Sequence, residues 1–155
     1  YADSAWTFPV GKISEAAEKL LKITEESLYK ALSQARPGNR LGDVGNAVEK
    51  HVKPHGFTVV KEMVGHGVGT SMHEEPQIPN FGPKGTGERI RPGMTLAIEP
   101  MVNLGAYKTK TLADGWTVVT ADGSPPAHFE HTVLTTERGP EILTLPHARA
   151  AQVSV

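Results

Sequence analysis

The stretch Thr95-Leu96-Ala97-Ile98-Glu99-Pro100 runs from apolar residues into a carboxylate and then a proline, and it indicates how the second half of this chain folds. The apolar run predicts a buried strand, and Pro100 ends regular strand pairing because proline has no backbone N–H to donate. A carboxylate that enters a core without a partner costs many kcal/mol. Glu99 must therefore be paired, protonated or bound to a metal, and a metal ion and an arginine are the two partners to consider.

Short runs of the same kind recur through the second half of the chain. Glycines and prolines separate them, and this pattern predicts short strands joined by turns. The runs lie at residues 58–60, 95–98, 116–120 and 129–135.

The first half carries apolar residues at helical spacing instead. This spacing predicts one helix from Ser14 to about Ala35 and a second from about Leu41 to His55. Ser14 can cap the first helix, and a glycine at residue 56 can end the second. Two helices followed by short strands predict an α+β fold in which the helices cover an antiparallel-rich sheet.

The length of 155 residues fits one ordinary domain. Residues 77–92 are rich in proline and glycine and predict a loop within that domain. We predict a single domain over residues 1–147 and a tail over residues 148–155. Residues 1–8 resemble the middle or end of a strand, which indicates that a native N-terminus has been lost, with a processed start as the alternative.

Charge and composition narrow the partners. The chain has 16 basic and 17 acidic side chains, a net charge of -1, and no cysteine. This balance argues against nucleic acid and anionic membrane surfaces as partners, and no apolar run is long enough to span a bilayer. The lack of cysteine excludes thiolate metal sites and disulfides and fits a cytoplasmic location.

Two further segments carry residues that commonly bind metals. His66 lies in Gly65-His66-Gly67-Val68-Gly69, just after a predicted strand, and Glu130 lies in the apolar stretch Phe129-Glu130-His131-Thr132. An imidazole with carboxylates suits Mn²⁺, Fe²⁺, Co²⁺ or Zn²⁺. Each residue also has a structural alternative, which is a hydrogen-bonded histidine for His66 and a salt-bridged glutamate for Glu99 and Glu130.

His73 follows His66 by seven residues. The glycines between them make a helix improbable, so we expect His73 on a turn or at the next strand. An imidazole there can donate a hydrogen bond to a substrate or act as an acid or base. The alternative is a solvated turn over residues 73–76.

These segments together resemble the type I methionine aminopeptidases. The resemblance rests on four stretches in the same order and spacing, and it extends over nearly the whole chain. They are Gly65-His66-Gly67-Val68-Gly69 with His73-Glu74-Glu75-Pro76, Pro92-Gly93-Met94-Thr95 with Ile98-Glu99-Pro100-Met101, Asp114-Gly115-Trp116-Thr117, and Phe129-Glu130-His131-Thr132. The resemblance implies the pita-bread fold, in which two similar α/β halves flank the metals. This chain resembles the second half with the final strand of the first.

In that family, two aspartates, one histidine and two glutamates hold two divalent metal ions. The resemblance implies that Asp3, His66, Glu99 and Glu130 are four of these five ligands. The remaining aspartate would lie before Tyr1, so one metal site is complete in this chain and the other depends on a missing residue. Co, Mn, Fe and Zn are the metals that this ligand set admits.

The activity implied by the resemblance is removal of the N-terminal methionine from proteins and peptides by a metal-activated water. Glu99 would serve as general base as well as ligand, and His73 would hydrogen-bond the substrate carbonyl or the tetrahedral intermediate. Met72 and Trp116 resemble walls of the methionine pocket, although such residues more often belong to a core. The implied partners are a Met-Xaa peptide, the ribosome and a separate chain that supplies the missing part.

Two other functions remain open from the sequence. The related peptidases that cleave Xaa-Pro bonds share the fold, but they fit Gly93-Met94-Thr95 and Glu99-Pro100 less closely. A pita-bread module that binds peptides or partner proteins without turnover is the second alternative, and the retained carboxylates argue against it.

Overall fold

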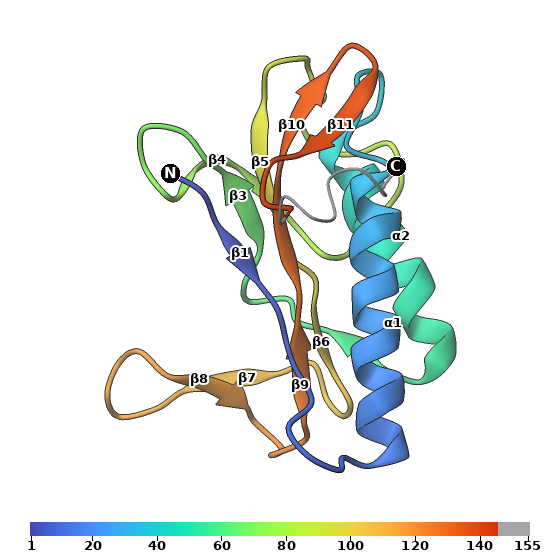
Figure 1. The fold of residues 1–155 in the computed structure, drawn as a ribbon, viewed down its shortest axis with the longest axis vertical. Coiled ribbons are helices and arrows are strands. Elements are labelled where there is room, and N and C mark those ends of the chain that lie inside the picture. Colours follow the sequence, from blue (N-terminus) through green and yellow to red (C-terminus); the bar gives the residue numbers. More distant parts are fainter. Residues whose placement is uncertain (146–155) are drawn as a thin grey trace.

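Two α-helices lie on one side of an antiparallel sheet in this protein (Figure 1). The computed structural model describes residues 1–145, so the predicted tail and the predicted domain end at residue 147 lie outside the described residues. No helix among residues 1–145 combines the length and the apolar composition that a membrane crossing requires.

Both predicted helices are present, with the predicted caps. Helix α1 spans Glu15–Leu32, and the hydroxyl of Ser14 accepts a hydrogen bond from the backbone N–H of Ala17 at its start. Helix α2 spans Leu41–Val52 and continues as the 3-10 turn η1, Lys53–His55. Gly56 then ends the turn in the left-handed region, with φ of 82°, which favours glycine.

Within the described residues, the larger sheet has six strands, and every pairing in it is antiparallel. Five strands form one path, and the sixth pairs with β10 outside that path. In spatial order the path is β1 (Ser4–Ala5), β10 (Glu130–Thr136), β5 (Thr95–Ile98), β3 (Gly65–Gly67) and β4 (Glu74–Ile78), with β11 (Gly139–Ile142) beside β10.

Two smaller sheets extend the structure. The first pairs three strands, and the second is a hairpin that projects from the body of the molecule (Figure 1). The three-stranded sheet contains β2 (Thr58–Val59), β6 (Met101–Asn103) and β9 (Pro126–His128). The hairpin contains β7 (Thr109–Thr111) and β8 (Val118–Thr120).

The strand predictions are correct in kind and incomplete in number. The run at 95–98 is strand β5, and the other three runs each contain or overlap a strand. Strand β3 was not predicted, because two of its three residues are glycines, which weaken a strand signal. His66 therefore lies within a strand and not after one, and residues 77–78 belong to β4 and not to the loop.

The core lies between the helices and one face of the large sheet. Apolar side chains of α1 and α2 pack there against Leu96 and Ile98 of β5 and Val133 of β10. These three strand residues are fully buried, and each such burial contributes about 1.5–3 kcal/mol. The opposite face of the same strands therefore remains available for other side chains.

The loop over residues 79–92 is held against helix α2. The side chain of Asn46 donates a hydrogen bond to the carbonyl of Gly82, and Glu49 accepts one from the backbone N–H of the same glycine. Gly45 permits this close approach, because a Cβ there would collide with the backbone of Pro79 and Phe81. The loop leads back into β5, so its docking fixes the strand that precedes Glu99.

We predict that Gly45→Ala destabilises the protein although alanine favours a helix. The helix preference contributes about 1 kcal/mol, while overpacking against rigid backbone costs about 1–3 kcal/mol, so we expect a net loss of up to about 2 kcal/mol. Urea unfolding followed by circular dichroism measures it. Ala47→Gly in the same helix is the control, and its free energy of unfolding should fall only because glycine has a lower helix preference than alanine. A Gly45→Ala protein more stable than the wild type would show that the loop is not docked as described.

Candidate metal centre

Four adjacent strands each contribute one candidate ligand. Asp3 directly precedes β1, Glu130 begins β10, Glu99 directly follows β5 and His66 lies within β3. Because these strands are neighbours in the order β1-β10-β5-β3, residues that are far apart in the sequence become spatial neighbours.

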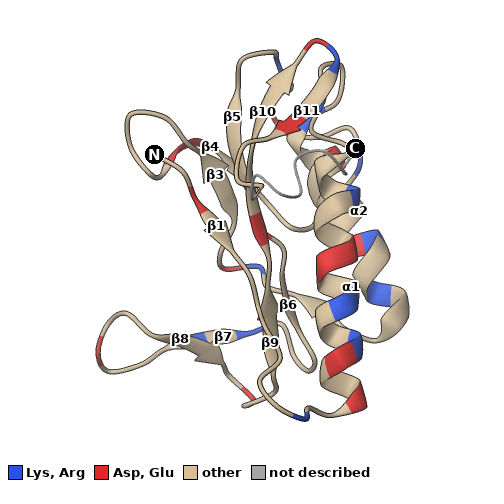
Figure 2. Cartoon of the chain, viewed as in Figure 1, with Lys and Arg blue, Asp and Glu red and all other residues tan. Residues whose placement is uncertain are grey.

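The register of the sheet places these residues on the face away from the helices. His66 pairs with Ala97, whereas Leu96 and Ile98 point into the helix-covered core. Side chains alternate between faces along a strand, so Glu99 shares the face of Ala97. By the same alternation, the side chain of Glu130 points to the opposite face of the sheet from the side chain of His131. In Figure 2, one acidic segment directly precedes β1 and another begins β10, while α1 carries charges of both signs.

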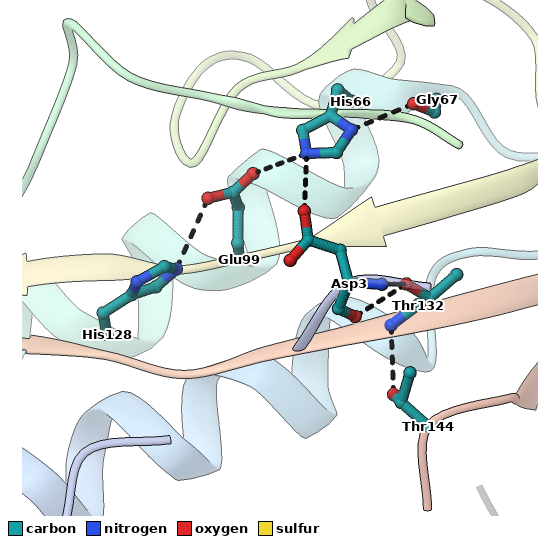
Figure 3. A network of polar contacts seen from close by, with 7 residues as sticks. All are labelled: Asp3, His66, Gly67, Glu99, His128, Thr132 and Thr144. Atoms are coloured by element: carbon teal, nitrogen blue, oxygen red, sulfur yellow. Dashed lines mark hydrogen bonds and ion pairs between the residues drawn. The ribbon is translucent and has the colours of Figure 1, made fainter. Parts of the chain in front are cut away.

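The side chains converge at the middle of this face (Figure 3). Nε2 of His66 lies 3.7 Å from Oδ2 of Asp3 and 3.5 Å from Oε1 of Glu99. Ligand atoms of His66, Glu99 and Glu130 all lie within 4.8 Å of one another, and so do those of Asp3, His66 and His73. The structure thus brings together every residue that the sequence suggested as a ligand.

The tautomer of His66 follows from its hydrogen bond. Nδ1 lies 2.9 Å from the backbone carbonyl of Gly67, and a carbonyl only accepts, so Nδ1 carries the proton. In the neutral form of the ring, Nε2 therefore directs a lone pair toward Asp3 and Glu99. Lone pairs of an imidazole and two carboxylates repel one another unless a proton or a metal ion lies between them.

Glu130 shows the same need for a positive charge. Its side chain is buried, and its Oε1 has no hydrogen-bond partner among the described residues. Burial, with added repulsion from the carboxylates of Glu99 and Asp3, raises the pKa of Glu130 to about 8. Within residues 1–145, no lysine or arginine forms an ion pair with any of these three carboxylates. The arginine alternative for Glu99 is therefore not realised, and the donor set fits a divalent metal ion.

Thr132 holds Asp3 in place and was not predicted from the sequence. Its hydroxyl accepts a hydrogen bond from the backbone N–H of Asp3 at 3.0 Å and donates one to the carbonyl of Asp3 at 2.7 Å. The backbone N–H of Thr132 in turn donates to the hydroxyl of Thr144 (Figure 3). The position of Thr132 two residues after Glu130 could have indicated its role, because this spacing puts both side chains on one face of the strand.

His73 lies on the bend before β4, as expected, and its side chain is exposed. Its ring centroid is 4.3 Å from that of His66, with 56° between the ring planes. His73 thus borders the cluster from the solvent side, where it can reach a bound molecule.

A cleft of about 500 Å³ opens beside the cluster. Its polar wall includes His66, His73, Glu99 and His128, and its apolar wall comes mainly from the segment after β2 and from β6, β8 and β9. Met72 and Trp116, predicted as pocket walls, are not among the residues that line it. Met72 is 42% exposed and Trp116 is 87% exposed, so neither is part of the core within the described structure.

The comparison with known proteins decides the family. Residues 1–137 match the metallopeptidase family M24. The chain belongs to this family. Methionine aminopeptidase 1 of Bacillus subtilis is 58% identical over 144 residues, which cover 93% of this chain and 58% of that protein. The methionine aminopeptidase of Escherichia coli is 47% identical over 145 residues, covering 94% of this chain and 55% of that protein.

Solved structures confirm the pita-bread fold. The methionine aminopeptidase of Thermotoga maritima superimposes with a TM-score of 0.92 at 52% identity, over 94% of this chain and 59% of that one. The prolidase of Pyrococcus furiosus superimposes with a TM-score of 0.70 at 25% identity, over 94% of this chain and 37% of that one. This M24 chain therefore spans less than two thirds of the length of these relatives.

We predict that Glu130→Gln abolishes tight binding of divalent metal. A neutral amide cannot offset the charge of a metal ion as a carboxylate does. Titration calorimetry with Mn²⁺ on the chain and the variant measures the loss. Glu137→Gln on the exposed β10–β11 turn is the matched control and should bind as the wild type does. Full metal loading of Glu130→Gln would disprove a ligand role for Glu130.

Proposed function

We propose that this chain carries the catalytic metal site of a methionine aminopeptidase, which hydrolyses the peptide bond after an N-terminal methionine. The observation that carries the proposal is the cluster of one imidazole and three carboxylates on the uncovered face of the sheet. The 58% identity to Methionine aminopeptidase 1 of Bacillus subtilis supports this specificity within the family. We also propose a cytoplasmic location, which the lack of cysteine fits.

Asp3, His66, Glu99 and Glu130 would hold the metal. Mn²⁺, Fe²⁺, Co²⁺ and Zn²⁺ suit this mixture of nitrogen and oxygen donors. We propose that the four residues complete one site, and that a second ion would be held by Asp3 and Glu130 together with a further aspartate. When bound, a divalent ion lowers the pKa of a water molecule and polarises the scissile carbonyl.

The residues of the chain supply the remaining chemistry. Glu99 would take the proton from the attacking water and pass it to the leaving amine. His73, which lies 4.3 Å from His66 between ring centroids, would donate a hydrogen bond to the carbonyl oxygen as negative charge develops there. In this proposal Glu99 moves the proton, and His73 stabilises the negative charge on the carbonyl oxygen.

Met72 and Trp116 are proposed to contact the methionine side chain. Trp116 lies in the turn of the β7–β8 hairpin, where Asp114 accepts hydrogen bonds from the backbone N–H groups of Trp116 and Thr117. The turn is thereby held while the indole stays exposed and free to contact another group. The ribosome and a second chain remain predictions as partners.

Two other functions are weaker. The prolidase of Pyrococcus furiosus shares the fold at 25% identity, well below the identity to methionine aminopeptidases, so cleavage of Xaa-Pro bonds is the second enzymatic candidate. A binding module without turnover would have little need for three carboxylates held close together at an energetic cost, so the retained cluster argues against it.

The test is turnover of a Met-Gly peptide against an Xaa-Pro peptide by the chain with added Mn²⁺ or Co²⁺. We expect release of free methionine from the first peptide and none of the Xaa residue from the second, measured by chromatography. Glu130→Gln is the inactive control. Cleavage of the Xaa-Pro peptide alone would favour the prolidase function, and metal binding without any turnover would contradict an enzymatic role for this chain alone.

We further predict that His73→Ala keeps the metal but slows turnover. Loss of one donor to the developing oxyanion typically lowers kcat by about 10²–10³-fold. Calorimetry with Mn²⁺ and steady-state kinetics on the Met-Gly peptide separate the two effects. If His73→Ala lost the metal instead, His73 would be a ligand and its placement outside the ligand set would be wrong.

A further inference from the structure

His128 was not singled out in the sequence, because its surroundings there resemble no site motif. It ends strand β9 and pairs with Met101 of β6, close to where the chain leaves Glu99. The hydroxyl of Thr7 fixes its backbone twice, by accepting from its N–H at 3.0 Å and by donating to its carbonyl at 2.7 Å. The side chain therefore starts from a well-defined position in the wall of the cleft.

The imidazole of His128 lies against Glu99 (Figure 3). Its Nε2 is 3.3 Å from Oε2 of Glu99, while Oε1 of the same carboxylate is 3.5 Å from Nε2 of His66. Glu99 thus lies between two imidazoles, and each of its oxygens faces a different ring. One oxygen faces the metal cluster and the other faces away from it.

The surroundings of His128 determine which ring nitrogen carries its proton. Nε2 is buried, and no described group forms a hydrogen bond of good geometry with it. Oε2 of Glu99 lies 3.3 Å from it. A bare Nε2 would bring its lone pair close to that carboxylate, whereas an Nε2–H would offer the carboxylate a donor. The Nε2–H tautomer is therefore the one that this position stabilises.

We propose that His128 is a positioning residue, which donates a hydrogen bond from Nε2 to the outer oxygen of Glu99 and so keeps the inner oxygen directed at the metal cluster. The proposal rests on the proposed metal function of Glu99. A partner that orients a ligating carboxylate in this way is commonly as necessary as the ligand itself. His66, by contrast, contacts the inner oxygen only.

The first test measures metal affinity in two variants. His128→Leu removes the donor, and we expect Mn²⁺ affinity to fall by about 10–100-fold, measured by calorimetry. His128→Gln places an amide N–H near the position of Nε2 and should restore affinity toward the wild-type value. His55→Leu, in the η1 turn that lines no part of the cleft, is the matched control and should bind as the wild type does. Equal affinity of His128→Leu and the wild type would overturn the proposal.

Kinetics distinguish positioning from substrate contact. At saturating Mn²⁺, His128→Leu should lower kcat on the Met-Gly peptide and leave KM near the wild-type value, because a positioning residue acts through Glu99 and not on the peptide. A raised KM with unchanged kcat and unchanged metal affinity would make His128 a substrate-contacting residue and would overturn the positioning role.

A third measurement does not depend on metal or on activity. In the metal-free chain, nitrogen–proton correlation spectra of the imidazole report its tautomer. We expect the Nε2–H form for His128, with a ring signal that shifts in Glu99→Gln. The Nδ1–H form, or a ring signal of His128 that does not shift in Glu99→Gln, would overturn the proposal even if every variant bound metal. Failure of the wild-type chain to bind Mn²⁺ would instead contradict the proposed function, while these spectra would still decide the contact between His128 and Glu99.

Discussion

The repulsion among three carboxylates and one imidazole lone pair is the constraint on which the site depends. Asp3 and Glu99 both lie within 3.7 Å of Nε2 of His66, and Glu130 is buried beside them. The raised pKa of Glu130 expresses the cost of this arrangement, since burial and the neighbouring carboxylates both disfavour its charged form. A protein keeps such a cluster only where something outside the cluster brings its members together.

Backbone pairing supplies that force. The ladders β1–β10, β10–β5 and β5–β3 bring the four residues together through main-chain hydrogen bonds, and the packing of Leu96, Ile98 and Val133 against the helices holds the sheet. A shift of register by one residue would turn the carboxylates into the apolar core, so packing on one face fixes the chemistry on the other. The hydroxyl of Thr132 adds the same kind of control at Asp3, where β1 is only two residues long.

The sequence pointed to the candidate ligands more readily than to the residues that support them. Glu99 and Glu130 stood out because each follows or interrupts an apolar run, and charge in such a place needs an explanation. The strand around His66 was missed because glycines dominate it, and glycine is a weak strand former whose use here is close approach to β4 and β5. His128 and Thr132 could not be recognised, because their roles come from neighbours that only the folded sheet brings close. Asp3 was found through family resemblance alone, since no spacing rule connects it to His66.

A proton relieves this repulsion only in part. One proton on Glu130 neutralises one carboxylate of three, and a neutral His66 still directs its lone pair at the other two. A divalent ion held by these residues would supply two positive charges and would accept the lone pair of His66 as well. The inner oxygen of Glu99 would then face a positive charge, while its outer oxygen faces His128. A donor on the far side of Glu99, where Nε2 of His128 lies, is therefore the complement that the carboxylate needs if it is to keep one orientation.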